Sequence, residues 1–280
     1  MFLNCHSYFS FKYGTLSVSE LFEEARRCGV HKLILTDINN TSAYIEMMRI
    51  CKERKHAHEL TISVGIEFRN GNELMYVGLA KNNTGFEQLN RFLSHHKYQK
   101  TPFKKSAPNI PDTYFIYPIS NLPASLKEHE YIGLRISDLN RIFSGEAKKL
   151  IQKSVILHPV TFKDRTTFNI HRLLRVVDQN TLLSKLDPAT QAKDDEVMMT
   201  EIALKHRFKQ YPETIRNTAE IMETCEVSFE FGNDKNIRHL LGSKKADFQY
   251  LKKIAREGYE RRYQDRSEER RVGKECRSRW

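Results

Sequence analysis

Short apolar runs alternate with amphipathic stretches from residue 1 to residue 158 of the chain. The apolar runs, which predict buried strands, lie at residues 1–3, 32–36, 60–68, 74–80, 114–117, 131–134 and 155–158. Several stretches between them carry an apolar residue at every third or fourth position, which is the period of a helix. About seven strands alternating with helices predict an α/β domain built from parallel β-α units with right-handed crossovers.

Short motifs and one periodic stripe refine the predicted helices. Residues 17–20 (Ser-Val-Ser-Glu) and 84–87 (Thr-Gly-Phe-Glu) have the spacing of a capping box, so we expect helices to begin there. In the helix expected at residues 41–54, Ile45, Met48 and Cys51 share one face, which we expect to point to the core. Beyond residue 158 the chain becomes mainly helical, with helices predicted at residues 169–177, 194–208, 212–225 and 246–263.

Two basic stretches could contact phosphate. Residues 97–112 contain three prolines and are interpreted as a surface loop, and solvation of its lysines is favoured over phosphate contact. The helix predicted at residues 246–263 has a basic side opposite its apolar side. The candidate nucleic-acid contacts are Lys104 and Lys105 in the loop and Lys252, Lys253 and Arg256 on the helix.

Composition narrows the classes of protein that the chain can belong to. A hydrophobic content of 39% with 16 Phe and 12 Tyr supports a packed core rather than disorder. No apolar run approaches the roughly 18 residues that a membrane span needs, and the N-terminus lacks the features of a signal peptide. The cysteines form no C-x-x-C pair, as is usual for reduced thiols. We therefore expect a soluble, cytoplasmic protein without a membrane partner.

The net charge of +11 favours a polyanionic partner such as nucleic acid, although a merely basic enzyme is an alternative. Residues 266–280 hold six Lys or Arg and three Glu, and their apolar residues show no period. This stretch resembles a translated cloning or sequencing-adaptor tail, so we interpret it as non-native and the chain as an N-terminal fragment.

The candidate chemistry lies where the first predicted strands end. The first strand leads into Asn4-Cys5-His6-Ser7, and Asp37 and Glu67 follow the next two strands at corresponding places. In α/β proteins the carboxyl ends of the strands form the mouth of the sheet or barrel, where ligands bind. We therefore expect His6, Asp37 and Glu67 to lie at one mouth.

These residues resemble the opening motifs of the PHP (polymerase and histidinol phosphatase) domain, in particular those of bacterial DNA polymerase III alpha subunits. Residues 79–86, 211–218 and 251–263 extend the likeness. The sequences of some segments are similar to those of alpha-type subunits from Bacteroidetes-like bacteria. The resemblance implies a distorted TIM-like (β/α)7 barrel at residues 1–225. Residues 226–265 would then form the start of the polymerase palm.

Intact PHP domains hold up to three divalent metals through nine His, Asp, Glu or Cys ligands, a set that suits Zn or Mn. In this chain, Asn4 and Tyr13 stand where the first motif has a His and an Asp. Ile38, Pro159 and Thr161 occupy further ligand positions. By this resemblance only His6, Glu67 and, as a possible third, Asp37 survive as vestigial metal ligands. We expect a metal-poor domain without catalytic residues.

The resemblance also implies what the parent protein does. The parent would synthesise DNA on a primer-template with Mg held by palm carboxylates, which no residue of this chain matches. Its partners would include a proofreading exonuclease and the sliding clamp. Two alternatives stay open, namely a stand-alone PHP metal-dependent phosphoesterase or 3′–5′ exonuclease, and a non-catalytic DNA-binding module. Bound Zn or Mn would favour the first, and salt-sensitive DNA binding the second.

Overall fold

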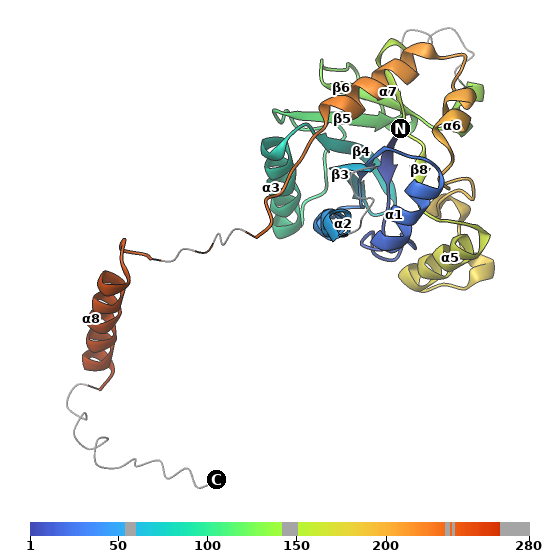
Figure 1. Cartoon of the computed structure of the whole chain (residues 1–280). Coiled ribbons are helices and arrows are strands. Elements are labelled where there is room, and N and C mark those ends of the chain that lie inside the picture. The colour runs from blue at the N-terminus through green and yellow to red at the C-terminus, as the bar shows by residue number, and fades with distance from the viewer. Residues whose placement is uncertain (54–59, 142–150, 233–235, 237–238, 264–280) are drawn as a thin grey trace. The chain divides into compact units, whose positions relative to one another are not determined.

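The computed structural model describes residues 1–53, 60–141, 151–232, 236 and 239–263 of the chain (Figure 1). It contains two compact units, Met1–Phe229 and Glu230–Trp280, which are considered separately. The predicted non-native tail, residues 266–280, lies outside the described residues. Among the helices of the described part, none is both long and apolar enough to cross a membrane.

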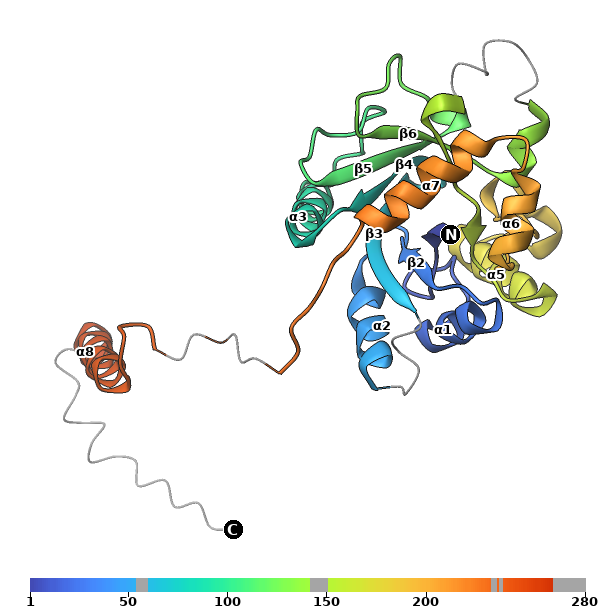
Figure 2. The same cartoon turned by 45° about the horizontal axis from the view of Figure 1, so that its top comes forward.

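The first unit is built on one curled, mixed sheet of eight strands (Figures 1 and 2). Its strands are β1 (Phe2–Cys5), β2 (Lys32–Leu35), β3 (Thr61–Asn70), β4 (Glu73–Ala80), β5 (Thr113–Pro118), β6 (Glu130–Leu134), β7 (Ser154–Ile156) and β8 (Pro159–Val160). Their order across the sheet is β7-β6-β5-β4-β3-β2-β1-β8. The predicted distorted α/β barrel is confirmed, with one more strand than predicted because residues 159–160 pair with β1.

The prediction that all strands run parallel was wrong at β4. This strand pairs antiparallel with both β3 and β5, whereas the other pairings are parallel. Asn70 pairs with Glu73, so only Gly71 and Asn72 connect β3 to β4. Gly71 has φ +59°, a conformation that glycine adopts without strain. Gly-Asn as the two connecting residues between apolar runs is a known hairpin signal, and here it outweighs the alternation of strands and helices.

Six helices surround this sheet in the described residues. They are α1 (Val18–Arg27), α2 (Ser42–Glu53), α3 (Asn83–Gln99), α5 (Arg165–Gln179), α6 (Glu201–Arg207) and α7 (Pro212–Thr224). The capping box predicted at residues 17–20 is present, and Pro212 occupies the first turn of α7. The helix α7 lies across the sheet and packs its buried Ile221 and Met222 against apolar strand residues (Figure 2).

Three details of the helix predictions were wrong. The N-cap of α3 is Asn82, whose side chain accepts from the Gly85 backbone, so Thr84 is already helical. On α2, Ile45 is 53% exposed, whereas its neighbour Tyr44 is buried. The helix predicted at residues 194–208 begins only at Glu201, because residues 196–197 run beside the end of β8, where the Glu196 carbonyl accepts from the backbone N–H groups of Thr161 and Phe162.

The last residues of the first unit are fastened to it by specific bonds. The backbone N–H of Glu226 donates to Lys81, and the Asn83 side chain exchanges two bonds of 3.0 Å with the Ser228 backbone. The Tyr44 hydroxyl donates to the carbonyl of Val227. These bonds hold residues 226–228 against the first unit. In the second unit, the helix α8 (Lys244–Tyr263) has no buried residue, so both its basic and its apolar residues reach the surface.

Candidate site at the mouth of the barrel

The structure brings His6 and Glu67 together, as the sequence predicts. His6 follows β1 and Glu67 lies in β3, and both side chains are fully buried. The His6 Nε2 atom lies 3.1 Å from Glu67 Oε2, and its Nδ1 atom lies 3.0 Å from the hydroxyl of Thr161. Both ring nitrogens of His6 therefore already have partners within the protein.

Glu67 is a buried carboxylate with a complete set of partners. Asn4, at the position of the missing histidine, donates to Oε2 over 2.7 Å, and Arg69 donates from Nε to Oε1 over 2.5 Å. Burial alone would raise the pKa of Glu67, but the Arg69 guanidinium and His6 hold that pKa well below its usual range. Glu67 is therefore ionised, with an arginine as its counterion.

The sequence analysis missed Arg69. Residues two apart on a strand face the same side, so Glu67 and Arg69 both point into the barrel mouth. The Arg69 guanidinium lies 4.4 Å from the centre of the Tyr13 ring and also donates to the Tyr13 hydroxyl. Burial raises the pKa of Tyr13 to about 12, so the ring stays neutral. An aromatic ring thus lies where the resemblance places a carboxylate, with a guanidinium beside it.

A second arginine–carboxylate pair lies at the same mouth. Arg135, just after β6, donates to Glu196 over 3.2 Å, and the Thr161 hydroxyl donates to the other Glu196 oxygen over 2.6 Å. Glu196 is only 2% exposed. Thr161 therefore links Glu196 to His6 in one network. Neither Arg135 nor Glu196 was predicted, since Glu196 reaches the mouth through a loop that has no periodic pattern.

Asp37 is buried near His6 and Glu67 but bonds to neither side chain in the described residues. Its Oδ1 atom accepts from the Ser7 backbone over 2.7 Å and from the Ser10 hydroxyl over 2.6 Å, and Oδ2 accepts from the Ser7 hydroxyl. Burial raises the pKa of Asp37, and the bonds from Ser10 and Ser7 oppose this change. Asp37 thus fastens the turn after β1.

His171 belongs to the wall of the same mouth. Its Nδ1 atom lies 2.7 Å from the Tyr13 carbonyl, and its Nε2 atom accepts from the Ala192 backbone N–H over 2.9 Å. Because Nε2 accepts a bond, the ring is neutral with its hydrogen on Nδ1. Burial lowers the pKa of His171 to about 4. The ring holds the loop around residues 189–193 against the turn after β1.

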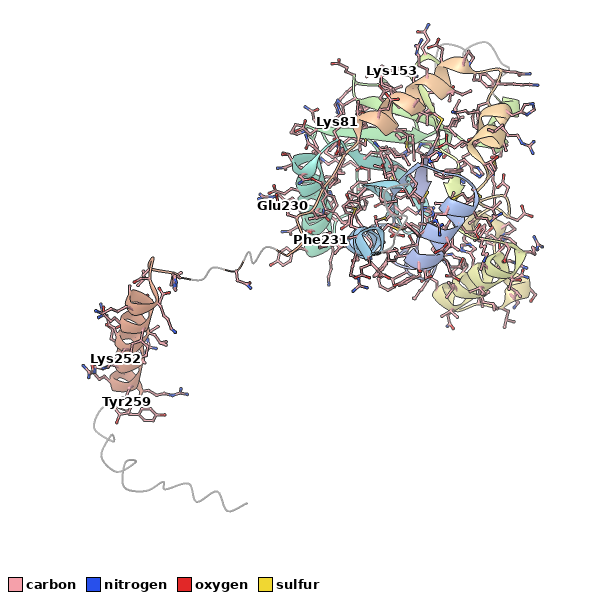
Figure 3. All side chains as sticks on the ribbon, in the orientation of Figure 1. Lys81, Lys153, Glu230, Phe231, Lys252 and Tyr259 are labelled. Carbon is pink, nitrogen blue, oxygen red and sulfur yellow. The ribbon has the colours of Figure 1, made fainter. Side chains whose placement is uncertain are left out.

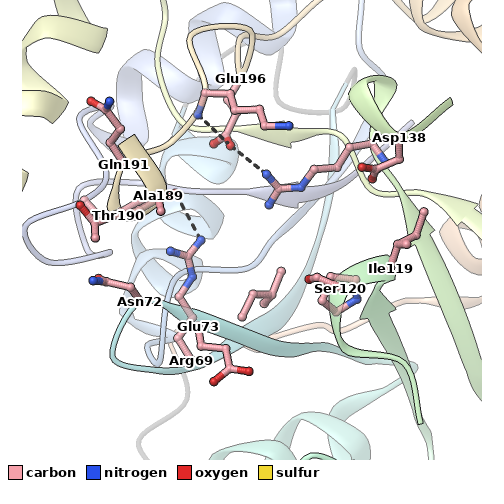
Figure 4. A pocket seen from close by; sticks show the side chains of 15 residues that line it. Arg69, Asn72, Glu73, Ile119, Ser120, Asp138, Ala189, Thr190, Gln191 and Glu196 are labelled. Carbon is pink, nitrogen blue, oxygen red and sulfur yellow. Dashed lines mark hydrogen bonds and ion pairs between the residues drawn. The ribbon is translucent and has the colours of Figure 1, made fainter. Parts of the chain in front are cut away.

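Above these pairs lies a cavity of about 570 Å³ (Figure 4). It is lined by charged and polar side chains, including Arg69, Asn72, Ser120, Arg135, Lys193 and Glu196. Within the described residues, no group of three or more His, Cys, Asp or Glu side chains could hold a metal ion. The oxygens of Glu67 and Glu196 instead face guanidinium, amide and hydroxyl donors. This donor set does not fit the multinuclear centre that the resemblance implies.

The five candidate nucleic-acid contacts fall into two groups. Lys104 and Lys105 are exposed in the segment that follows α3 in the first unit. Lys252, Lys253 and Arg256 are exposed on α8 in the second unit, where Figure 3 shows Lys252 on the helix surface. Each group lies on the surface of its own unit. The structure leaves their role as DNA contacts a prediction.

Comparison with known proteins defines the class of this fold and site. The family model described as the PHP domain matches residues 3–153, which is more than half of the chain. The chain therefore belongs to the PHP domain family, as the resemblance predicted.

Its relatives are DNA polymerases. Error-prone DNA polymerase 2 of Agrobacterium fabrum is 19% identical over 251 residues, covering 81% of this chain and 23% of that protein. The error-prone DNA polymerase of Symbiobacterium thermophilum is 24% identical over 278 residues, covering 80% of this chain and 25% of that protein. The DNA polymerase III subunit alpha of Ureaplasma parvum is 35% identical over 92 residues, covering 33% of this chain and 9% of that protein. The chain thus spans about a quarter of the length of the first two; the likeness to Bacteroidetes-like sequences stays a prediction.

Proposed function

We propose that this chain carries a structural PHP domain, without a metal centre, of a bacterial DNA polymerase of the alpha or error-prone type. One observation carries the proposal: the acids at the barrel mouth already have arginines as counterions. Glu67 pairs with Arg69 and Glu196 pairs with Arg135, at 2.5 and 3.2 Å. In this proposal DNA synthesis belongs to other parts of the parent protein.

The physical argument concerns the cost of burying charge. An isolated buried carboxylate is destabilised by several kcal/mol, and either a metal ion or a paired arginine can offset this cost. Here the positive charge is part of the chain, because Arg69 stands two residues after Glu67 on the same strand. The domain can therefore fold around its mouth without recruiting a metal from solution.

The proposal extends to the partners of the parent. The names of the relatives, which are DNA polymerases, support DNA as the substrate of the parent. The proposal further includes a primer-template as the form of that DNA and Mg bound by carboxylates elsewhere in the parent. A proofreading exonuclease and the sliding clamp would be further partners, in the cytoplasm. Residues 226–265 would connect the PHP domain of residues 1–225 to the palm. The bonds that fasten residues 226–228 suit such a fixed connection.

Metal analysis and thermal unfolding of the chain test the absence of a metal centre. We expect protein from Zn- and Mn-supplemented cultures to hold well below one equivalent of either metal. Its Tm should be the same with and without EDTA, because a ligand that binds only the native state would raise the Tm. Turnover of a phosphate ester, or stoichiometric metal whose removal lowers the Tm, would instead support the stand-alone phosphoesterase.

The exposed basic side of α8 favours a second role, in DNA binding. We propose that Lys252, Lys253 and Arg256 contact DNA phosphates, because they follow one another at helical spacing on an exposed helix. Replacing all three with Gln should weaken primer-template binding and reduce its salt dependence. The matched control replaces three exposed arginines of the first unit, Arg49, Arg91 and Arg216, with Gln instead. Equal binding by the chain and the triple variant would rule out this role for α8.

A further inference from the structure

The helix α5, at the edge of the first unit, presents apolar side chains to the surface (Figures 1 and 2). Its buried residues follow one another three or four positions apart and therefore share one side of the helix: Phe168, His171 and Arg175. Three apolar residues at the same spacing lie on the opposite side: Ile170, Leu173 and Val177. They are 45%, 53% and 68% exposed. A surface helix usually carries polar residues on this side, so the stripe needs an explanation.

The apolar surface continues just beyond the helix. Leu182 and Leu183 are exposed as well, and the short helix Leu183–Lys185 lies beside α5. Together with the stripe they form a surface that we call the α5 patch. In the described part of the first unit, five of the eleven exposed large hydrophobic side chains belong to this patch. Single exposed apolar residues are common on soluble proteins, whereas a cluster of them indicates an interaction surface.

Beside the patch, α5 carries one arginine for which the described residues offer no counterion. The other charged side chains of the helix are paired, Arg165 with Asp194 and Arg175 with Asp178. For Arg172, by contrast, no hydrogen bond or ion pair of the guanidinium is found in the part of the chain that the structure describes. A partner with an acidic residue at this edge of the patch would therefore supply the counterion of Arg172.

We propose that the α5 patch binds an amphipathic helix of a partner protein, with a leucine-rich side and an acidic edge. Apolar residues at positions i, i+3 and i+7 are the anchors through which an amphipathic helix is recognised. A second copy of the chain fits less well, because a symmetric pairing about Leu173 would bring the adjacent Arg172 beside its own copy. The patch lies on the opposite side of α5 from His171 and the barrel mouth, so it is independent of the roles proposed above.

Binding of two synthetic helical peptides to the 280-residue chain tests the proposal. Both peptides have a leucine side with the i, i+3, i+7 spacing, and their edges carry glutamate in one and lysine in the other. Fluorescence anisotropy at constant ionic strength should show saturable binding, tighter for the glutamate peptide. Leu173→Ser should weaken this binding by about tenfold or more, since a leucine would no longer be buried. The matched control is Ile45→Ser on α2, where the side chain is also 53% exposed, and it should leave the affinity unchanged.

Reversal of one charge tests the acidic edge of the partner. Arg172→Glu should weaken binding of the glutamate peptide by about threefold and strengthen that of the lysine peptide by about as much, as expected for an exposed charge pair. Arg207→Glu reverses an exposed arginine on α6 and should leave both affinities unchanged. Circular dichroism checks that each variant folds.

Three results of the peptide titrations would overturn the proposal: no saturable binding of the glutamate peptide, unaltered binding by folded Leu173→Ser, or an unaltered preference in Arg172→Glu. Dimerisation of the chain, or binding to anionic lipid vesicles, would also overturn it if Leu173→Ser abolished that association, because another occupant would then cover the α5 patch. Sedimentation measures both. None of these outcomes affects the metal analysis, so the structural role is tested separately.

Discussion

Glu67 and Asp37 are two buried acids on neighbouring parallel strands, one within β3 and the other just after β2, yet their surroundings are opposite. Glu67 is paired with a guanidinium, which holds its pKa below the usual range. Among the described residues Asp37 has no such counterion, and burial raises its pKa although Ser7 and Ser10 donate to it. The resemblance treats both as metal ligands. The comparison shows that acidic residues on neighbouring strands can serve two structural purposes.

The difference follows from which donors the neighbouring residues can bring to each carboxylate. Residue 69 faces the same side of β3 as Glu67, so an arginine there reaches the carboxylate directly. Asp37 ends a short strand beside the turn of residues 7–10, which supplies only backbone N–H and hydroxyl donors. Glu67 therefore pairs with a buried arginine at the barrel mouth, and Asp37 stabilises the turn after β1.

Replacing Arg69, the counterion of Glu67, should have the largest effect on stability. Arg69→Met leaves Glu67 buried without its counterion, and we expect a loss of about 3–5 kcal/mol in the free energy of unfolding. Urea unfolding at pH 7 measures it. The double variant Arg69→Met/Glu67→Gln should recover much of the loss because no unpaired charge remains.

A matched substitution shows whether burial causes this effect. Arg91→Met removes an arginine from an exposed pair with Glu87, and we expect a change of about 0.5 kcal/mol or less. Arg69→Met could instead lower the free energy of unfolding by no more than Arg91→Met does. Arg69 would then not be a needed counterion of Glu67, and the proposal that arginines neutralise the acids at the barrel mouth would fail.

The neutral His171 should cause the next largest effect, a dependence of stability on pH. Its folded pKa of about 4 lies below the ordinary 6.5. The unfolded chain therefore binds the proton first, and stability that is fully present above pH 6.5 is lost as the pH falls toward 4. At about 1.4 kcal/mol per tenfold change in proton affinity, the loss is about 3 kcal/mol.

Unfolding of the chain and of His171→Gln between pH 7 and pH 4 measures this loss as a difference. Gln can still accept from the Ala192 N–H but cannot be protonated. The stability advantage of the unaltered chain should shrink as the pH falls. A pH-independent difference would mean that His171 is not held in its neutral form.

The sequence predicts much of the fold but only half of the site. Apolar periodicity located the strands and most helices, and the Gly71-Asn72 pair could have identified the antiparallel β3–β4 hairpin. Arg69 could have been found, because a residue two positions after Glu67 shares its face. Glu196 could not, because a loop carries it to Thr161 through contacts distant in the sequence. The candidate ligands came from motif positions, which say nothing about counterions.

The smallest expected effect is that of Asp37→Asn on stability. Its pH dependence should have the opposite sign to that of Glu67→Gln. Asp37→Asn keeps the shape of the side chain and should cost about 1 kcal/mol, since one accepting oxygen becomes a donor. The folded pKa of Asp37 lies above its ordinary 3.8, so the stability advantage of Asp over Asn should fall as the pH rises above 3.8. The folded pKa of Glu67 lies below its ordinary 4.5, so the advantage of Glu over Gln should be complete above pH 4.5 and fall below it.

Urea unfolding of the chain, Asp37→Asn and Glu67→Gln at several pH values measures both differences, and the contribution of His171 cancels in each. Opposite slopes would establish that the two acids have opposite surroundings. Slopes of the same sign would show that the two acids share one electrostatic environment. The Arg69 guanidinium would then act on the whole mouth rather than on Glu67 alone, and Asp37 would belong to the charged network instead of the turn.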